Sequence, residues 1–234
     1  MERVLVVQHE DPCPPGLVGR WLVEDGLEVD VRRPYAGEPL PQGPGALDGH
    51  AGLLVLGGAM GADDDAEHPW LTTTKALLRA AVAEGLPTLG ICLGHQLIAS
   101  ALGGRVERNP AGRQRGLVAV GWQPAAGTDA LTAGLARAAL APHWNQDVVV
   151  DLPSGAVPLA LSPGGELQVV RYAAGCWGLQ CHPEADASIV AGWPGTGAVV
   201  PEVRAAEAAL ERDWRPVSTA WARLVLGGRL GGAA

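Results

Sequence analysis

The stretch Leu89-Gly90-Ile91-Cys92-Leu93-Gly94-His95-Gln96 decides the interpretation of the chain, because it has the pattern of a buried strand that passes directly into a helix. Glycines stand two residues before and two residues after Cys92, an arrangement typical of the sharp turn that carries a nucleophile. Such a turn brings its central side chain to the carboxyl edge of a parallel sheet, where α/β folds bind ligands. The positive end of the following helix favours thiolate over thiol. Cys92 is therefore the candidate nucleophile, and the alternative is a cysteine that serves only as a small buried residue.

Apolar runs and helical patterns alternate through the first half of the chain. They predict strands at 4–7, 27–31, 52–56 and 88–91, and helices at 14–25, 71–84 and 93–102. Strands that alternate with helices form a doubly wound, mainly parallel α/β sheet flanked by helices.

The second half of the chain has shorter apolar runs joined by turns. We expect strands within 105–122 and at 148–152, 157–162, 167–172 and 178–181, which predicts a smaller antiparallel part. Helices are expected near 185–191, 202–212 and 217–225. We find no linker or repeat, so residues 1–234 are expected to form a single domain, with a frayed glycine-rich tail at 226–234.

Composition narrows the class of protein. Apolar residues make up 47% of the chain and charged residues 18%, as in a folded globular protein. The net charge is −8 and no basic stripe occurs, which argues against a nucleic-acid partner. No apolar run reaches the length of a membrane span, and the first residues lack a signal core. The spacing of the four cysteines fits neither a disulfide framework nor a zinc site. We therefore expect a cytoplasmic enzyme without a metal.

A base for a cysteine nucleophile is expected among the histidines. His182 follows an apolar strand directly, and Glu184 lies two residues further on, after Pro183. A bend there would let the carboxylate of Glu184 bind one imidazole nitrogen while the other faces Cys92. The alternative is a surface loop without a role. His95 lies three residues beyond Cys92 on the predicted helix, and we expect a packing role for it.

Two motifs together resemble those of the class I, or triad, glutamine amidotransferases. They are Gly90-Ile-Cys-Leu-Gly-His-Gln96 and Trp177-Gly-Leu-Gln-Cys-His-Pro-Glu184, and further similarity covers Leu56-Gly-Gly-Ala-Met-Gly61, residues 97–104 and residues 143–147. The resemblance is to stand-alone domains of the GMP-synthase-like type. It implies a flavodoxin-like fold and no cofactor, and it implies that residues 143–147 form a loop beside the active site.

The resemblance also implies roles for the matched residues. The catalytic triad would be Cys92, His182 and Glu184. The backbone N–H groups that hold the oxyanion would be those of Gly58 and Leu93. The substrate-binding residues would be Gln96, Gly57 and His143. The acidic run Asp63–Asp65 is expected to be a solvated loop and not a metal site.

The function itself stays open among three hypotheses. The first is a glutaminase that passes ammonia to an acceptor on a separate synthetase partner. The second is a self-sufficient γ-glutamyl hydrolase or peptidase, since the same triad serves when only the leaving amine differs. The third is a binding module on an enzyme scaffold, which the complete triad disfavours although fold alone does not prove activity.

Overall fold

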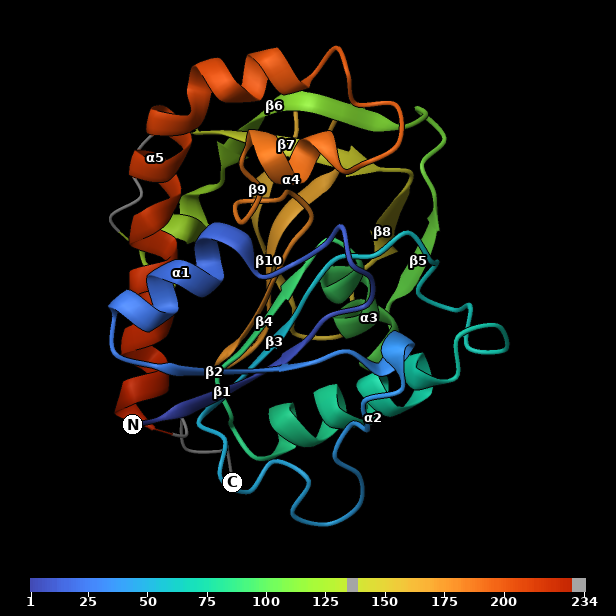
Figure 1. The fold of residues 1–234 in the computed structure, drawn as a ribbon, viewed down its shortest axis with the longest axis vertical. Helices are drawn as coiled ribbons and strands as arrows, with labels where there is room; N and C mark the ends of the chain where they lie inside the picture. The colour runs from blue at the N-terminus through green and yellow to red at the C-terminus, as the bar shows by residue number, and fades with distance from the viewer. Residues whose placement is uncertain (134–138, 229–234) are drawn as a thin grey trace.

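The computed structural model describes residues 1–133 and 139–228. Nine strands form one mixed sheet in the order β2-β1-β3-β4-β11-β10-β9-β6-β7, and a second sheet pairs β5 with β8. Helices flank the larger sheet on both faces (Figure 1). The α/β architecture with a parallel part and a smaller antiparallel part, predicted from the sequence, is confirmed.

The parallel half of the sheet contains the strands of the predicted doubly wound core. They are β1 (Arg3–Val7), β2 (Glu28–Arg32), β3 (Gly52–Val55), β4 (Thr88–Ile91) and β11 (Cys176–Leu179). All neighbouring pairs among them run parallel. Strand β11 comes from late in the chain and lies beside β4, with Leu179 opposite Ile91. This pairing brings residues near 180 to the same sheet edge as Cys92.

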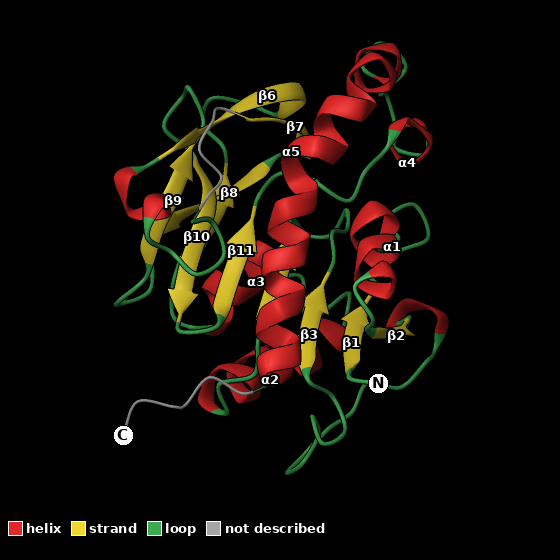
Figure 2. Cartoon of the chain, turned by 90° about the vertical axis from the view of Figure 1, so that its left-hand side faces the viewer, coloured by secondary structure: helices red, strands yellow, loops and turns green. Residues whose placement is uncertain are grey.

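Side chains that alternate along the strands divide the core into two layers. Val4 and Val6 face the layer that contains α1 (Gly16–Glu24) and α5 (Val200–Gly227). Leu5 and Val7 face the layer that contains α2 (Trp70–Ala83) and α3 (Leu93–Ala101). Figure 2 shows α5 running along one face of these strands. Burial on both faces explains why β1, after Arg3, and β3 are continuous apolar runs, whereas the edge strand β2 is less buried and alternates with charged residues.

The antiparallel half extends the sheet beyond β11. It consists of β10 (Leu167–Ala173), β9 (Val157–Leu161), β6 (Gln114–Trp122) and β7 (Ala139–Asn145). The small second sheet pairs β5 (Arg105–Arg108) with β8 (Asp147–Asp151). The expected loop at 143–147 is wrong, because β7 continues to Asn145 in register with Gln114 and β8 begins at Asp147. Ladder pairing with β6 makes this segment a strand, which its mixed composition does not indicate.

Two further elements differ from the prediction. The helices expected at 202–212 and 217–225 are one helix, α5, with Pro216 inside it. Proline lacks a donor and normally interrupts a helix, but Trp214 and Val217 are buried on either side of it and hold both segments against the sheet. The strand expected at 178–181 begins at Cys176 and ends at Leu179, where its pairing with β4 ends. Of the expected tail, residues 226 and 227 are helical and residues 229–234 lie outside the described residues.

Two remaining features complete the fold. A short helix, α4 (Ala187–Ala191), follows the segment after β11, and its N-cap Asp186 accepts hydrogen bonds from the backbone of Ser188 and Ile189. No helix within residues 1–133 and 139–228 is long and apolar enough to cross a membrane.

Candidate active site

The turn between β4 and α3 holds Cys92 in a strained backbone conformation. Its φ is 51° and its ψ is −105°, and among the described residues it is the only non-glycine residue with positive φ. Backbone strain of this kind costs about 1–3 kcal/mol and persists only where the surroundings enforce it. The turn leaves the side chain at the first turn of α3 and at the carboxyl edge of the sheet. The residue predicted to be the nucleophile, Cys92, therefore has a constrained backbone.

The two flanking glycines are required by close backbone contacts. A Cβ atom on Gly90 would lie 2.5 Å from the carbonyl carbon and oxygen of Gly94. A Cβ atom on Gly94 would lie 2.0 Å from the carbonyl oxygen of Val55, at the end of the neighbouring strand β3. Real Cβ contacts are much longer, so no other residue fits either position without a backbone shift. The G-x-C-x-G pattern is thus the sequence signature of a helix packed directly on two strands.

His182 and Glu184 form a buried pair beside Cys92. The Nδ1 atom of His182 lies 2.7 Å from Oε1 of Glu184, and both residues are almost fully buried. Burial by itself would lower the pKa of His182, but the charges of Glu184 and Cys92 and the hydrogen bonds to both raise it to about 10. These interactions favour the protonated imidazole, which lies beside a carboxylate and near the sulfur atom of Cys92.

The His182 ring is held in place from several directions. The ring of Trp193 packs against it with centroids 4.6 Å apart. The backbone N–H of His182 donates to the carbonyl of Pro142 in β7, over 2.9 Å. The carbonyl of Glu184 accepts from the N–H of Leu17 at the start of α1, also over 2.9 Å. Contacts to two other elements thus restrain the segment that follows β11.

The backbone after β3 lies against the nucleophile. A Cβ atom on Gly57 would lie 3.1 Å from Cε1 of His182 and 3.6 Å from Cβ of Cys92, and one on Gly58 would lie 3.0 Å from Cδ2 of Leu93. Leu93 is the first residue of α3, where backbone N–H groups lack intrahelical partners. Glycines therefore allow a carbonyl group bound at Cys92 to approach two backbone segments.

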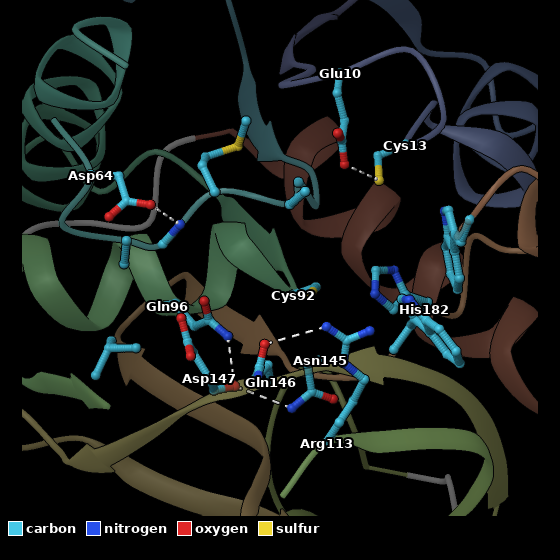
Figure 3. Close-up of a pocket in the computed structure, with 18 of the residues that line it drawn as sticks. Glu10, Cys13, Asp64, Cys92, Gln96, Arg113, Asn145, Gln146, Asp147 and His182 are labelled. Atoms are coloured by element: carbon cyan, nitrogen blue, oxygen red, sulfur yellow. Dashed lines mark hydrogen bonds between the residues drawn. The ribbon is translucent and has the colours of Figure 1, made fainter. Parts of the chain in front are cut away.

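A cavity of about 690 Å³ opens onto these groups. Its wall includes Cys92, His182 and Gln96, together with Trp144, Asn145, Gln146 and Asp147 from the end of β7 and the start of β8. Figure 3 shows Cys92 between Gln96 on one side and His182 on the other. Polar groups thus converge on a concave space beside the sulfur, as in ligand sites.

Two polar residues of the site were not recognised from the sequence. Gln180 is completely buried and donates from Nε2 to the sulfur of Cys92 over 3.6 Å. Arg113 lines the cavity, where its guanidinium lies 5.4 Å from the Trp144 ring centroid, a cation–π distance, and donates to Gln146. The sequence did contain a signal for Gln180, because it is a polar residue within an apolar run. A buried polar side chain needs a hydrogen-bond partner, so such a residue is a candidate for a contact in the site.

His143 and His95 lie apart from the cavity wall. The ring nitrogens of His143 contact the carbonyl of Ala141 and the side chain of Gln168, and the residue is 1% exposed. The site that the structure brings together therefore does not include His143. His95 is buried with its Nδ1 3.1 Å from the hydroxyl of Tyr172.

The acidic run beside the cavity is occupied by contacts within its own loop and with α2 and α3. Asp63 accepts from Ser100, Asp64 accepts from the backbone of Gly61, and Asp65 pairs with Lys75. Lys75 also lies 3.6 Å from Asp63, so the carboxylates of Asp63 and Asp65 share this cation, whereas Asp64 binds a backbone N–H.

The fold and the site together point to one class of protein. Comparison of the sequence with known families identifies this class. The model of the glutamine amidotransferase class-I family matches residues 18–189. The chain therefore belongs to the class I glutamine amidotransferase family, and membership implies an enzyme.

The relatives of the chain differ from one another in the activity that their names describe. The chain is 32% identical over 198 residues to the glutamine amidotransferase-like protein YfeJ of Salmonella typhimurium, which covers 81% of this chain and 79% of that protein. It is 30% identical over 175 residues to γ-glutamyl peptidase 5 of Arabidopsis thaliana, covering 71% and 66%. It is 39% identical over 100 residues to a glutamine-hydrolysing GMP synthase subunit of Methanosarcina barkeri, covering 42% and 51%.

The similarity in fold to solved structures covers nearly the full length of both chains. A glutamine amidotransferase from Methylobacillus flagellatus superposes with a TM-score of 0.85 at 27% identity, covering 100% of this chain and 98% of that chain.

Proposed function

We propose that the protein hydrolyses the side-chain amide of glutamine, with Cys92 as nucleophile, His182 as acid and base, and Glu184 as the residue that orients His182. The observation that supports this most strongly is the buried pair of His182 and Glu184, 2.7 Å apart, beside a cysteine on a strained strand-to-helix turn. Nucleophile, base and orienting carboxylate in this relation form the general catalytic triad.

In the first half of the reaction, the thiolate of Cys92 attacks the carbonyl carbon of the amide. A carbon–sulfur bond forms, and the carbonyl oxygen becomes an anion that accepts hydrogen bonds from the backbone N–H groups of Gly58 and Leu93. One such donor is typically worth about 10²–10³ in rate. The imidazolium of His182 then gives its proton to the departing nitrogen, the carbon–nitrogen bond breaks, and ammonia leaves behind a γ-glutamyl thioester. The raised pKa of His182 keeps this proton available at neutral pH.

In the second half, water attacks the thioester. The neutral His182 takes a proton from the water, a carbon–oxygen bond forms, and the carbon–sulfur bond breaks. Glutamate leaves, and the proton held by His182 restores the imidazolium–thiolate pair. Glu184 stabilises the imidazolium at both stages, because its carboxylate lies 2.7 Å from Nδ1 of the ring.

The ammonia is expected to serve an acceptor on a separate partner protein. This part of the proposal is supported by the similarity to the Methanosarcina barkeri protein, which by name is a glutamine-hydrolysing subunit of GMP synthase. A cytoplasmic location is part of the proposal as well and is supported by four unpaired cysteines, which persist in reducing compartments.

The test is to incubate the purified protein with glutamine and measure glutamate and ammonia. We expect turnover that disappears in Cys92→Ala and persists in Cys176→Ala, a matched control because Cys176 is also a buried free cysteine but lies in the layer under α2 and α3. Mass spectrometry should detect a γ-glutamyl adduct on Cys92. Equal turnover in the wild type and Cys92→Ala would exclude the proposed nucleophile.

A second candidate function is hydrolysis of γ-glutamyl conjugates. The observation that favours it is the cavity of about 690 Å³, because sites of about 300–1,000 Å³ enclose ligands of drug size. The similarity to γ-glutamyl peptidase 5 agrees with this reaction. The acyl half of the chemistry is identical, and His182 would protonate an amine instead of ammonia.

A panel of γ-glutamyl amides and peptides, assayed beside glutamine, separates the two functions. A higher kcat/KM for conjugates, lost in Cys92→Ala, would assign the protein as a γ-glutamyl hydrolase. Turnover restricted to glutamine would assign it as a glutaminase. No adduct and no turnover with any compound would contradict both.

A further inference from the structure

Two glutamine side chains and one backbone carbonyl next to Cys92 form a connected chain of hydrogen bonds. Nε2 of Gln96 donates to the carbonyl oxygen of Asp147 over 2.9 Å and to Oε1 of Gln180 over 3.1 Å. Nε2 of Gln180 donates to the sulfur of Cys92 over 3.6 Å. The chain thus runs from the backbone of β8, through α3, to the nucleophile.

The orientation of both amides follows from the chemistry of this chain. The two ends of a glutamine amide have nearly the same shape, so hydrogen-bond partners decide which end is the donor. The carbonyl of Asp147 can only accept, so the atom of Gln96 that faces it must be the nitrogen. That nitrogen can only donate, so the atom of Gln180 that faces it must be the oxygen. The nitrogen of Gln180 therefore faces the sulfur of Cys92.

Burial makes this orientation permanent in the folded state. Gln180 is 0% exposed and Gln96 is 4% exposed. If one of the two amides were flipped, an N–H group would face another N–H group or a carbonyl oxygen would face another oxygen, and no water could reach them to form replacement hydrogen bonds. The backbone of Gln180 is also fixed, because its N–H donates to the carbonyl of Gln168 over 2.8 Å. One segment after β11 thus carries both the amide of Gln180, which donates to the sulfur, and the ring of His182, which lines the same cavity as Cys92.

We infer that Gln180 is a positioning residue for the nucleophile: its amide N–H holds the sulfur of Cys92 in the attacking orientation and stabilises the thiolate, while Gln96 and the Asp147 carbonyl hold that amide in its donating orientation. The role rests on the proposed function of Cys92. A hydrogen bond to a charged acceptor is stronger than one to a neutral acceptor, so the donor favours the thiolate over the thiol. Both N–H groups of Gln96 are used in the chain, which leaves its oxygen for a ligand in the cavity.

Two substitutions separate this role from simple packing. Gln180→Glu keeps the shape and still accepts from Gln96, but it replaces the donor with a carboxylate. Gln180→Leu removes donor and acceptor together. If Gln180 only supports Gln96, the leucine variant loses turnover but keeps the wild-type pH dependence of Cys92 alkylation. If the donor to sulfur matters, both variants are impaired, and the glutamate variant more so, because its charge opposes the thiolate.

The measurement is the pH dependence of Cys92 alkylation by iodoacetamide, followed by intact mass with Cys92→Ala as background. We expect the midpoint of alkylation in Gln180→Glu to move upward by at least about one pH unit, and the rate at pH 7 to fall about tenfold or more. In turnover, kcat should fall more than KM rises. Gln168→Glu, an equally buried glutamine beyond contact with the sulfur, should keep the wild-type midpoint.

A wild-type alkylation profile in Gln180→Leu would overturn the inference. Should that variant fail to fold by circular dichroism, a wild-type profile in Gln180→Glu would overturn it in the same way. Should neither fold, the side-chain amide resonance of Gln180 in the wild-type protein decides, because it must shift when Cys92 is alkylated. Alkylation requires no turnover, so absence of glutamine hydrolysis would contradict the proposed function and leave this test intact.

Discussion

At the residue scale, the geometry of the site depends on glycines, because a side chain at these positions would collide with neighbouring atoms. Glycines at 90 and 94 let β4, α3 and β3 come into direct backbone contact, and this contact holds Cys92 at positive φ. Gly57 similarly leaves room for the ring of His182.

We therefore expect Gly94→Ala to destabilise the protein severely. The new Cβ would lie 2.0 Å from the carbonyl oxygen of Val55, so the helix or the strand must move, which costs more than about 3 kcal/mol. Gly127→Ala is the matched control, because a Cβ there would meet no atom within 4 Å. Urea unfolding compares the two. Similar free energies of unfolding would contradict the proposed packing.

A second residue-scale prediction concerns Glu184. In Glu184→Gln the imidazolium of His182 loses its neighbouring charge, so the pKa of His182 should fall from about 10 toward or below its ordinary value. NMR titration of the ring measures this shift, and kcat should fall by roughly 10²–10⁴. Glu211→Gln, at an exposed ion pair with Arg20, should change neither quantity. An unchanged His182 titration would show that Glu184 does not control the ring.

At the element scale, α5 closes one face of the sheet and contacts the strand that leads to the site. The indole N–H of Trp214 donates to the carbonyl of Leu140 in β7 over 2.8 Å. Trp221, further along the same helix, is equally buried, but its indole N–H has no hydrogen-bond partner among the described residues.

These two tryptophans make a matched pair for substitution. Trp214→Phe removes the donor of the hydrogen bond to Leu140, whereas Trp221→Phe removes a donor that has no partner among the described residues. Both leave a similar void, so Trp214→Phe should cost about 1–3 kcal/mol more in the free energy of unfolding. Chemical denaturation of both variants tests this difference. Equal losses would show that the hydrogen bond to Leu140 contributes nothing beyond packing.

At the scale of the whole molecule, buried histidines make stability depend on pH. Burial lowers the pKa of His9 and of His95 to about 3, and for His9 the nearby His68 lowers it further. Their ordinary pKa in an unfolded chain is about 6.5. Below that pH the unfolded chain therefore binds protons that the folded protein does not. Their contribution to stability is present above about pH 6.5 and is lost as the pH falls toward about 3.

We expect the free energy of unfolding to fall by about 1.4 kcal/mol per pH unit for each of these histidines between about pH 6 and pH 4. In His95→Gln the slope should decrease by that amount. Tyr172→Phe removes the hydroxyl partner of His95 but leaves the histidine buried, so it should lower stability without changing the slope. Urea unfolding across this pH range measures both. An unchanged slope in His95→Gln would contradict burial of a neutral ring.

The sequence by itself determined the parallel core, the turn at Cys92 and the segment of His182 and Glu184. These features are local: continuous apolar runs, glycines at close contacts and a short bend each depend on neighbouring residues. The contacts of Gln180 with Gln96 and Cys92 join residues 84 and 88 positions apart, and only the pairing of β11 with β4 brings them together. The same holds for His143, whose ring is turned from the cavity toward Gln168 by its strand. Buried polar side chains take their partners from strand order and register, which the tertiary structure decides, because their hydrogen bonds must be satisfied by whatever the fold places beside them.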